Sequence, residues 1–186
     1  MDNLFIGTYV IWLLSEIILN RMLRSNTTDK KGADNNSLLV IWVIIVAAVT
    51  AALFTSASFA MPISGNDNIR YAGLAVILIG IILRIIAVRT LGKFFTVDVT
   101  IRQGHRLVKN GMYKYFRHPS YTASLLSFIG FGLSLNNWYS LLILVFAVVV
   151  VFLMRIRIEE KALTAQFGDE YLQYKKEAWG LLPFMH

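Results

Sequence analysis

Residues 121–154 read YTASLLSFIGFGLSLNNWYSLLILVFAVVVVFLM, two apolar runs separated by two asparagines. A helix of about 20 apolar residues crosses the hydrocarbon core of a bilayer, which is about 30 Å thick. The first run, 121–135, is short for a full span, and the second covers 138–154. Because only Asn136 and Asn137 separate them, we expect a helical hairpin that turns at the far face of a membrane, with polar residues completing the N-terminal turn of its first helix.

Three further apolar runs precede this hairpin, at about 4–20, 38–61 and 71–91. The chain has 186 residues, of which 56% are hydrophobic. This composition lies outside that of ordinary soluble domains and is typical of polytopic membrane proteins. We therefore expect an all-α, polytopic integral membrane protein with about five transmembrane helices, forming a single domain over residues 1–186.

The basic residues predict an orientation, because Lys and Arg in short loops favour the cytoplasmic side. The loop before the third run holds only Arg70, and the other basic segments fall on one side of a five-span topology. They contain Arg21, Arg24, Lys30 and Lys31; Lys93, Arg102, Arg106, Lys109, Lys114 and Arg117; and Arg155, Arg157, Lys161, Lys175 and Lys176. The N-terminus is then outside and the C-terminus cytoplasmic.

The formal net charge of +7 does not indicate nucleic-acid binding, since the basic residues lie mainly between apolar runs. The chain has no cysteine, which excludes disulfides, thiolate nucleophiles and thiolate metal sites. Its three histidines, His105, His118 and His186, make no set with metal-ligand spacing. We therefore expect neither a metal site nor a nucleic-acid partner.

The segment 159–174 predicts an amphipathic helix on the cytoplasmic face. Apolar residues recur in it at helical spacings of three and four, with charged residues between them. They are Leu163, Phe167, Tyr171 and Tyr174. Gly168 should interrupt or bend this helix.

Three polar clusters, at 104–113, 116–121 and 155–176, lie on the predicted cytoplasmic side. Because they share one side, we expect them to converge on one pocket within a core motif region at 92–186.

In the second cluster, FRHPSY, Pro119 suits the first turn of a helix and keeps His118 outside it. The N–H groups at such a helix start attract anions, and the fork of Arg117 suits a carboxylate or phosphate. Alternatively, Arg117 and His118 anchor the helix in the headgroup layer beside a belt of tyrosines. The tyrosines in question are Tyr113, Tyr115 and Tyr121.

Glu159 and Glu160 follow the last apolar run in a basic setting. One interpretation is a surface salt bridge at helical spacing with Arg155, Arg157 or Lys161. The other is a carboxylate that faces a ligand. Since neighbouring residues do not easily face one pocket together, we expect one Glu inside and the other in an orienting or structural role.

Arg84 lies within the third apolar run. We expect it to extend its side chain to the cytoplasmic interface rather than to take part in chemistry.

The stretch HRLVKNGMYKYFRHPSY, followed after the hairpin by EEKALTAQFGDEYLQYKKEAWGLLPF, resembles the isoprenylcysteine carboxyl methyltransferases, including their prokaryotic relatives. The resemblance covers residues 105–184. Membrane sterol reductases and phospholipid methyltransferases carry similar stretches, but the reductases usually have Asn at the position of Ser120. Ala123 departs from the family, which commonly has Gly nearby.

The resemblance implies S-adenosyl-L-methionine as cofactor. It implies O-methylation of the carboxylate of an isoprenylcysteine-like or other lipophilic substrate. This substrate, a prenylated compound or a lipophilic small molecule, would enter the site from the bilayer, among membrane lipids. It implies Arg117, Glu159 and Glu160 as catalytic candidates, with Arg117 aligning the acceptor carboxylate. Candidate cofactor contacts are His105, Leu107, Val108, Gly111, Tyr113, His118, Pro119, Ser120, Tyr121 and Glu159. The short N-terminal region suggests a compact prokaryotic form in the inner (plasma) membrane.

Three other functions stay open at this point. The first is N-methylation of a phospholipid or other amine, for which Glu159, Glu160 or a tyrosine could remove the proton. The second is an NADPH-dependent sterol-type reductase. The third is a membrane protein without catalytic activity, which predicts that Arg117, His118 and Glu159 are individually replaceable.

Overall fold

A computed structural model describes residues 3–22, 30–31, 37–95, 100–101 and 106–183. Its α-helices are α1 (Asn3–Met22), α2 (Ser37–Ser58), α3 (Asn68–Leu91), α4 (Pro119–Ser134), α5 (Trp138–Phe167) and α6 (Asp169–Glu177). Two 3₁₀ turns, η1 (Gly92–Phe94) and η2 (Gly111–Lys114), and two short strands, β1 (Lys30–Lys31) and β2 (Thr100–Ile101), complete the described elements.

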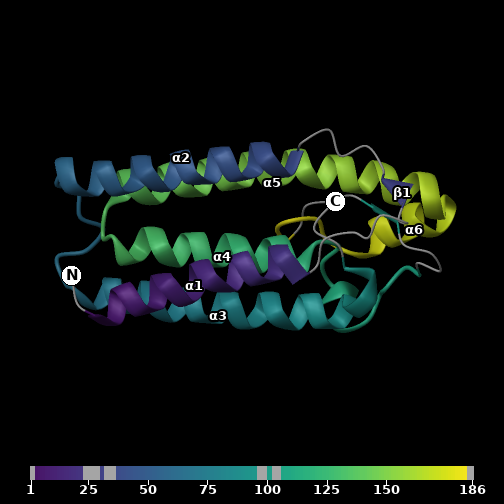
Figure 1. Cartoon of the computed structure of the whole chain (residues 1–186), viewed down its shortest axis with the longest axis horizontal. Helices are drawn as coiled ribbons and strands as arrows, with labels where there is room; N and C mark the ends of the chain where they lie inside the picture. Colours follow the sequence, from purple (N-terminus) through teal and green to yellow (C-terminus); the bar gives the residue numbers. More distant parts are fainter. Residues whose placement is uncertain (1–2, 23–29, 32–36, 96–99, 102–105, 184–186) are drawn as a thin grey trace.

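Helices α1, α2, α3, α4 and α5 run side by side along the long axis of the molecule (Figure 1). α4 lies in the middle, with α3 packed along one side of it and α5 along the other. α1 packs on α3, and α2 packs on α5. The helical fold class is confirmed, and one antiparallel pair of two-residue strands, β1 with β2, adds to it.

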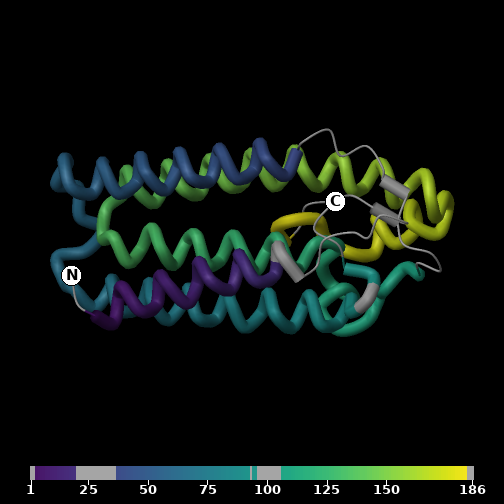
Figure 2. The backbone as a smooth tube through the Cα atoms, viewed as in Figure 1, coloured from purple at the N-terminus to yellow at the C-terminus, as the bar shows by residue number. Residues whose placement is uncertain are grey.

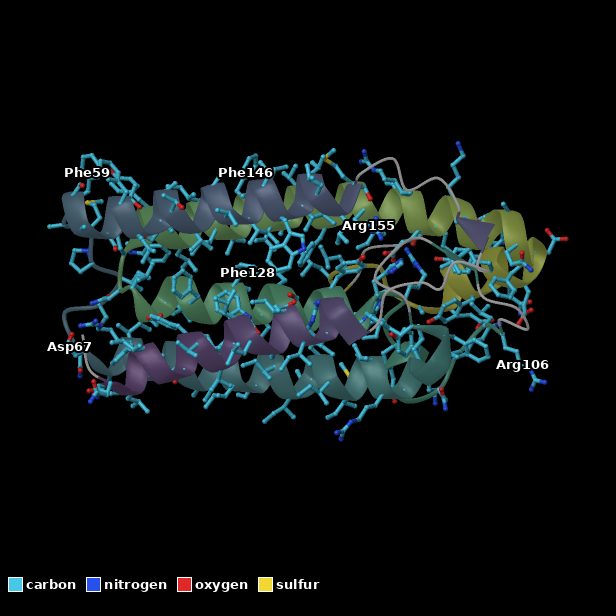
Figure 3. All side chains as sticks on the ribbon, in the orientation of Figure 1. Phe59, Asp67, Arg106, Phe128, Phe146 and Arg155 are labelled. Atoms are coloured by element: carbon cyan, nitrogen blue, oxygen red, sulfur yellow. The ribbon has the colours of Figure 1, made fainter. Side chains whose placement is uncertain are left out.

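Within the part of the chain that the structure describes, three helices, α2, α3 and α5, are long and apolar enough to cross a membrane. The apolar part of α1, Asn3–Leu19, and α4 with 16 residues are shorter. Large apolar side chains cover the outside of the bundle: Phe146, labelled in Figure 3, is 74% exposed and Phe54 is 65% exposed. An apolar exterior of this kind suits contact with lipid. The protein is an integral membrane protein.

The predicted helical hairpin is confirmed. α4 ends at Ser134 and α5 begins at Trp138. Asn136 has a φ of 49°, a left-handed conformation that Asn tolerates better than most residues. Asn137 then caps α5 by accepting a hydrogen bond from the backbone N–H of Ser140. The two asparagines therefore form the turn and start the next helix.

Glycine allows α3 and α4 to approach closely. A Cβ added at Gly73 would lie 2.4 Å from the backbone nitrogen of Ser134, and one added at Gly130 would lie 2.7 Å from the carbonyl oxygen of Gly73. Neither position can hold a larger residue unless the two helices separate. Close packing through small residues is a common way to associate helices in membranes. Here it holds the C-terminal end of α4 against the N-terminal part of α3.

The predicted start of the last span at Trp138 is confirmed, but its predicted separation from the following helix is wrong. We expected one apolar span at 138–154 and a separate amphipathic helix at 159–174, but α5 continues to Phe167. Gly168, with a φ of 53°, ends α5, and α6 then begins at Asp169. The interruption at Gly168 is as predicted. The long α5 therefore carries Glu159 and Glu160 beyond the apolar bundle as part of the same rigid helix.

Candidate active site

The site is built around the start of α4. Pro119 occupies the first turn of this helix, and His118 precedes it with a non-helical φ of −126° and ψ of 55°. Both features were predicted. The carbonyl oxygen of His118 accepts hydrogen bonds from the backbone N–H groups of Tyr121 and Thr122. The expectation that this turn offers free donors to an anion is therefore wrong for these two groups.

Arg117 connects this motif to the end of α6. Its Nε donates to Glu160 Oε1 at 2.9 Å, and its Nη1 donates to the carbonyl oxygens of Lys175, at 2.9 Å, and of Ala178. Its backbone nitrogen also donates to the carbonyl of Trp179 at 2.7 Å. The guanidinium group is buried, so the interpretation of Arg117 as an anchor in the headgroup layer is wrong.

His118 lies between two carboxylates. Its Nδ1 is 3.5 Å from Glu159 Oε2, and its Nε2 is 3.4 Å from Glu160 Oε1. The expectation that only one of the two Glu residues would face the site is wrong. Neighbouring residues on a helix point about 100° apart, but an imidazole placed between them presents one nitrogen to each carboxylate.

The two carboxylates also set the charge of His118. Burial alone lowers the pKa of the imidazole, but Glu159 and Glu160 outweigh that effect and raise the pKa above its usual value of 6.5. A protonated imidazole between two carboxylates is thus favoured in the folded protein. His118 is buried, which also contradicts its interpretation as a headgroup anchor.

Glu159 is held by two further residues. Its Oε1 accepts a hydrogen bond from the Tyr121 hydroxyl and one from Arg155 Nε at 3.2 Å. Arg155 stands one helical turn earlier on α5, so the predicted salt bridge at helical spacing exists. It is not a surface pair, however, because Arg155 is only 1% exposed and also contacts Ser37. Figure 3 shows Arg155 where the apolar bundle meets the polar end.

The sequence predicted the pair of Arg155 with Glu159 but not that Arg155 is buried. An arginine one turn before two acidic residues, at the end of an apolar run, could have indicated a buried partner. Sequence reasoning also missed Lys175 on α6, whose Nζ lies 2.6 Å from Glu160 Oε2. Nothing in the local sequence shows that α6 turns back at Gly168 toward Glu160.

α6 closes over the segment that leads to α4. The Tyr174 hydroxyl donates to the carbonyl oxygen of Tyr113, and Leu107 packs against Tyr171, Tyr174 and Ala178. Burial raises the pKa of Tyr174 to about 12, so the phenol stays protonated and acts as a donor. The three polar clusters of the sequence therefore do meet at one end of the bundle, on the right in Figure 2.

The remaining predicted cofactor contacts differ in burial. Tyr113, Pro119 and Ser120 are buried, Val108 is half-buried, and Gly111 is exposed. Gly111 has a φ of 57° that favours glycine. His105 lies outside the described residues.

Arg84 does not extend to the interface as we expected. Its Nη2 pairs with Glu16 Oε2 on α1 at 2.9 Å, and its Nη1 donates to the carbonyl oxygen of Ser120 at 3.3 Å. The two side chains are only 14% and 15% exposed. Glu16 neutralises the charge inside the bundle, which removes the reason to reach water.

Within the described ranges, no group of three or more His, Asp or Glu residues could hold a metal ion. The site itself consists of two carboxylates, Glu159 and Glu160, surrounded by four cationic side chains and a phenol. The cations are Arg117, His118, Arg155 and Lys175, and the phenol is Tyr121.

The fold and the site together define a helical membrane protein with a buried acid–base cluster at one end of an apolar bundle. The model of the isoprenylcysteine carboxyl methyltransferase (ICMT) family matches residues 73–165, half of the 186 residues. The matched range contains α4 and its preceding motif, together with Glu159 and Glu160. The chain belongs to the isoprenylcysteine carboxyl methyltransferase family.

Individual relatives agree with this assignment. The chain is 38% identical over 115 residues to the protein-S-isoprenylcysteine O-methyltransferase of Saccharomyces cerevisiae, and the aligned region covers 61% of this chain and 48% of the relative. It is 39% identical over 118 residues to protein-S-isoprenylcysteine O-methyltransferase B of Arabidopsis thaliana, and the aligned region covers 61% of this chain and 59% of the relative. The chain thus spans about half the length of these curated relatives.

A solved structure is also similar. It is that of the eukaryotic intramembrane Ras methyltransferase ICMT, with a TM-score of 0.64 and 27% sequence identity. The match covers 82% of this chain and 54% of that one. The likeness therefore reaches beyond the residues of the family model and includes much of the N-terminal helical region.

Proposed function

We propose that this protein is an integral-membrane methyltransferase that uses S-adenosyl-L-methionine to O-methylate the carboxylate of an isoprenylcysteine-like or other lipophilic substrate. One observation carries the proposal: His118, between Glu159 and Glu160, forms a buried charged cluster at the point where an apolar bundle ends. Membership of the family and the names of the relatives support the same reaction.

The residues present fit a polar cofactor. Four buried side-chain polar atoms have no hydrogen-bond partner among the described residues, and two of them lie at this end of the bundle: His118 Nε2, whose contact with Glu160 lacks hydrogen-bond geometry, and the Tyr171 hydroxyl. The other two are Trp12 Nε1 and Arg84 Nε. The charge of Glu160 acts on Tyr171 as well, so the His118 and Tyr171 atoms belong to the same cluster. Buried polar groups in native proteins are nearly always hydrogen-bonded, and a polar ligand would supply the missing partners.

When bound, S-adenosyl-L-methionine would supply a methyl group on a positively charged sulfur. We assign its binding to the residues predicted for it from the sequence: Leu107, Val108, Gly111, Tyr113, His118, Pro119, Ser120, Tyr121 and Glu159, together with His105, which lies outside the described residues. Glu159 provides a negative charge beside this group, and the aromatic rings of Tyr113 and Tyr121 provide apolar surface. Tyr171 joins this set because of its unpaired hydroxyl.

The acceptor requires little acid–base chemistry from the protein. A carboxylate is already ionised near neutral pH, so O-methylation needs no strong base. The side chains instead have to hold the acceptor oxygen in line with the methyl group and exclude water. Four cationic side chains around two carboxylates leave an excess of positive charge, which favours an anionic acceptor over an amine.

Arg155 and Arg117 lie beside different parts of the site. Arg155 stands at the boundary with the apolar part of α5, from which a lipophilic acceptor would approach. Arg117 faces α6, where it bonds to Glu160 and to two backbone carbonyls. We therefore assign alignment of the acceptor carboxylate to these two guanidinium groups, with Arg117 acting through Glu160.

We also propose a topology of five spans, in which α1 and α4 lie in the membrane beside the three longer helices. The C-terminal ends of α1, α3 and α5 lie at the same end of the bundle (Figure 2). In a five-span topology with an external N-terminus, the first, third and fifth spans all end on the cytoplasmic side. The C-terminus and the cluster are then cytoplasmic, which suits a water-soluble cofactor. We assign the protein to the plasma membrane of a prokaryote.

The proposed function is tested with the full chain purified in detergent. S-adenosylhomocysteine and NADPH are titrated separately by calorimetry into the wild type and into His118→Ala. Methyl transfer from labelled S-adenosyl-L-methionine is then measured on a short S-prenylated cysteine with a free carboxylate, and on the same compound with a carboxamide.

Binding of S-adenosylhomocysteine that weakens in His118→Ala, with labelling of the carboxylate compound alone, is the expected result. Binding of NADPH alone would overturn the proposal in favour of a reductase. Binding of neither compound would favour a protein without this catalytic activity.

A further inference from the structure

The start of α4 is held from two opposite sides. On the side of α5, Glu159 and Glu160 contact His118 and Tyr121. On the side of α3, Arg84 donates to the carbonyl oxygen of Ser120. The α5 contacts belong to the proposed active site, whereas the α3 contact has no part in it so far.

Arg84 lies in a costly environment. It stands in the interior of α3, a candidate membrane span, and pairs with Glu16 of α1. Ser124 of α4 also donates to Glu16 Oε1, at 3.5 Å, so the pair joins three helices. Replacing a buried ion pair by apolar residues of similar volume is often neutral or stabilising. Stability alone is therefore a weak explanation for this pair.

The contacts of Arg84 point toward the site. Ser120 follows His118 and Pro119 directly, so the hydrogen bond from Arg84 restrains the turn that carries the imidazole. Burial has the largest effect on the pKa of the Tyr113 phenol and raises it, and the charges of Glu159 and Arg84 both act on the same group: Glu159 raises its pKa and Arg84 lowers it. Arg84 is thus within electrostatic range of a residue on which Glu159 of the cluster also acts.

We propose that Arg84 is a positioning residue: with its charge balanced by Glu16, it holds the first turn of α4 so that His118 and Tyr121 meet the carboxylates of α5. The guanidinium has a specific task here, because a hydrogen bond to a carbonyl needs a donor and a carboxylate or thioether side chain has none. The inference rests on the proposed function insofar as it concerns turnover.

A positioning role has a kinetic signature. Small displacements of groups that orient reactants cost about a hundredfold in rate in unfavourable cases, even when the altered residue is remote. Arg84 does not contact the proposed acceptor path along α5. Its loss should therefore lower kcat and leave the KM for the acceptor nearly unchanged.

The decisive variant is the double substitution Glu16→Met with Arg84→Met, which removes both charges and leaves neither unpaired. Arg89→Met is the matched control, because Arg89 is exposed and lies on the same helix. Each variant is measured for thermal unfolding, for kcat and KM, and for amide hydrogen exchange over residues 118–124.

We expect the double variant to unfold at or above the wild-type temperature, with kcat lowered about tenfold or more and the acceptor KM within about twofold. We also expect amide exchange at 118–124 to rise about tenfold, since the restraint on that turn is gone. Arg89→Met should match the wild type in all three measurements. Wild-type kcat and unchanged exchange in the double variant would overturn the proposal.

If the double Met variant does not fold, a second double variant tests the same proposal. Exchanging the charges, Glu16→Arg with Arg84→Glu, keeps the ion pair but places no donor opposite Ser120. Low kcat in this folded protein supports positioning, and full kcat shows that the pair is only structural. The exchange measurement needs no turnover, so it tests Arg84 even if the wild type proves unable to methylate.

Discussion

The two ends of the helical bundle both carry polar side chains, but these side chains have different partners. At the end near Phe59 and Asp67, labelled in Figure 3, Asn136 Oδ1 accepts from the backbone nitrogens of Ile63 and Ser64, both at 3.0 Å. Its Nδ2 donates to the carbonyl of Ser64 at 2.9 Å. These are neutral amides bonded to backbone.

At the opposite end, charged side chains bond mainly to one another. His118, Glu159 and Glu160 are the centre of that cluster, with cations around them. Side-chain amides that bond to the backbone fix the path of loops, and their hydrogen-bonding groups are not available to a ligand. Charged groups bonded to one another can exchange partners when a ligand of matching charge arrives. Substitutions at the two ends should therefore separate into effects on stability and effects on activity.

The largest expected effect is that of Glu159→Gln. The amide keeps the volume but removes the charge opposite Arg155 and His118, so methyl transfer should fall about a hundredfold. The comparison is with Glu177→Gln, which changes an exposed acidic residue on α6 and should leave the rate within about twofold. Radiolabel transfer measures both. Equal rates in the two variants would show that the cluster has no catalytic role.

A substitution at the other end should affect stability alone. Asn136→Ala removes three hydrogen bonds to backbone and places alanine at a φ of 49°, so we expect a loss of about 2 kcal/mol in the free energy of unfolding. Asn136→Gly removes the same bonds without the steric cost and should lose less. Chemical denaturation measures the loss. A specific activity per folded molecule below half that of the wild type would contradict the contrast between the two ends.

The pH dependence of stability should reveal His118. Because its pKa is raised in the folded protein, the stabilisation from its charge is fully present below pH 6.5 and is lost as the pH rises through the folded value. In His118→Gln, stability should not fall over this pH range. Glu159 and Glu160 still titrate at acid pH in that variant. Melting temperatures across the neutral and mildly alkaline range test it. A wild-type curve parallel to that of His118→Gln there would show that the imidazole carries no extra charge.

The smallest effect is expected at the edge of the cluster. Lys109 Nζ lies 3.7 Å from Glu170 Oε1, and the Glu170 side chain is 59% exposed. Surface pairs of this kind contribute about 0.5 kcal/mol or less, so Glu170→Gln should barely change unfolding. Raising the salt concentration should not enlarge the difference. A loss above about 1 kcal/mol would mean that the charged cluster extends to the surface.

Several elements were predictable because their causes are local. The hairpin follows from two apolar runs and two asparagines, and the turn before α4 follows from the restrictions that Pro119 imposes on His118. The convergence of the three polar clusters was also predictable, since the charge pattern places them on one side of the membrane. The assignment to the family followed from short motifs within that region.

Other features depended on contacts between distant segments. The partners of Arg84 and Glu16 lie on different helices, and no spacing in the sequence pairs them. The shared access of Glu159 and Glu160 to His118 depends on an imidazole that α4 brings between them. The approach of Lys175 depends on the turn at Gly168.

The sequence by itself determined that the chain is helical, apolar and membrane-embedded, because hydropathy and turn residues act within a few residues of one another. It also determined which residue types gather at the polar end. Only the tertiary structure decided which of those charges are buried together and which face solvent. Burial and ion pairing depend on positions in three dimensions, and helix packing, including the close approach at Gly73 and Gly130, sets those positions.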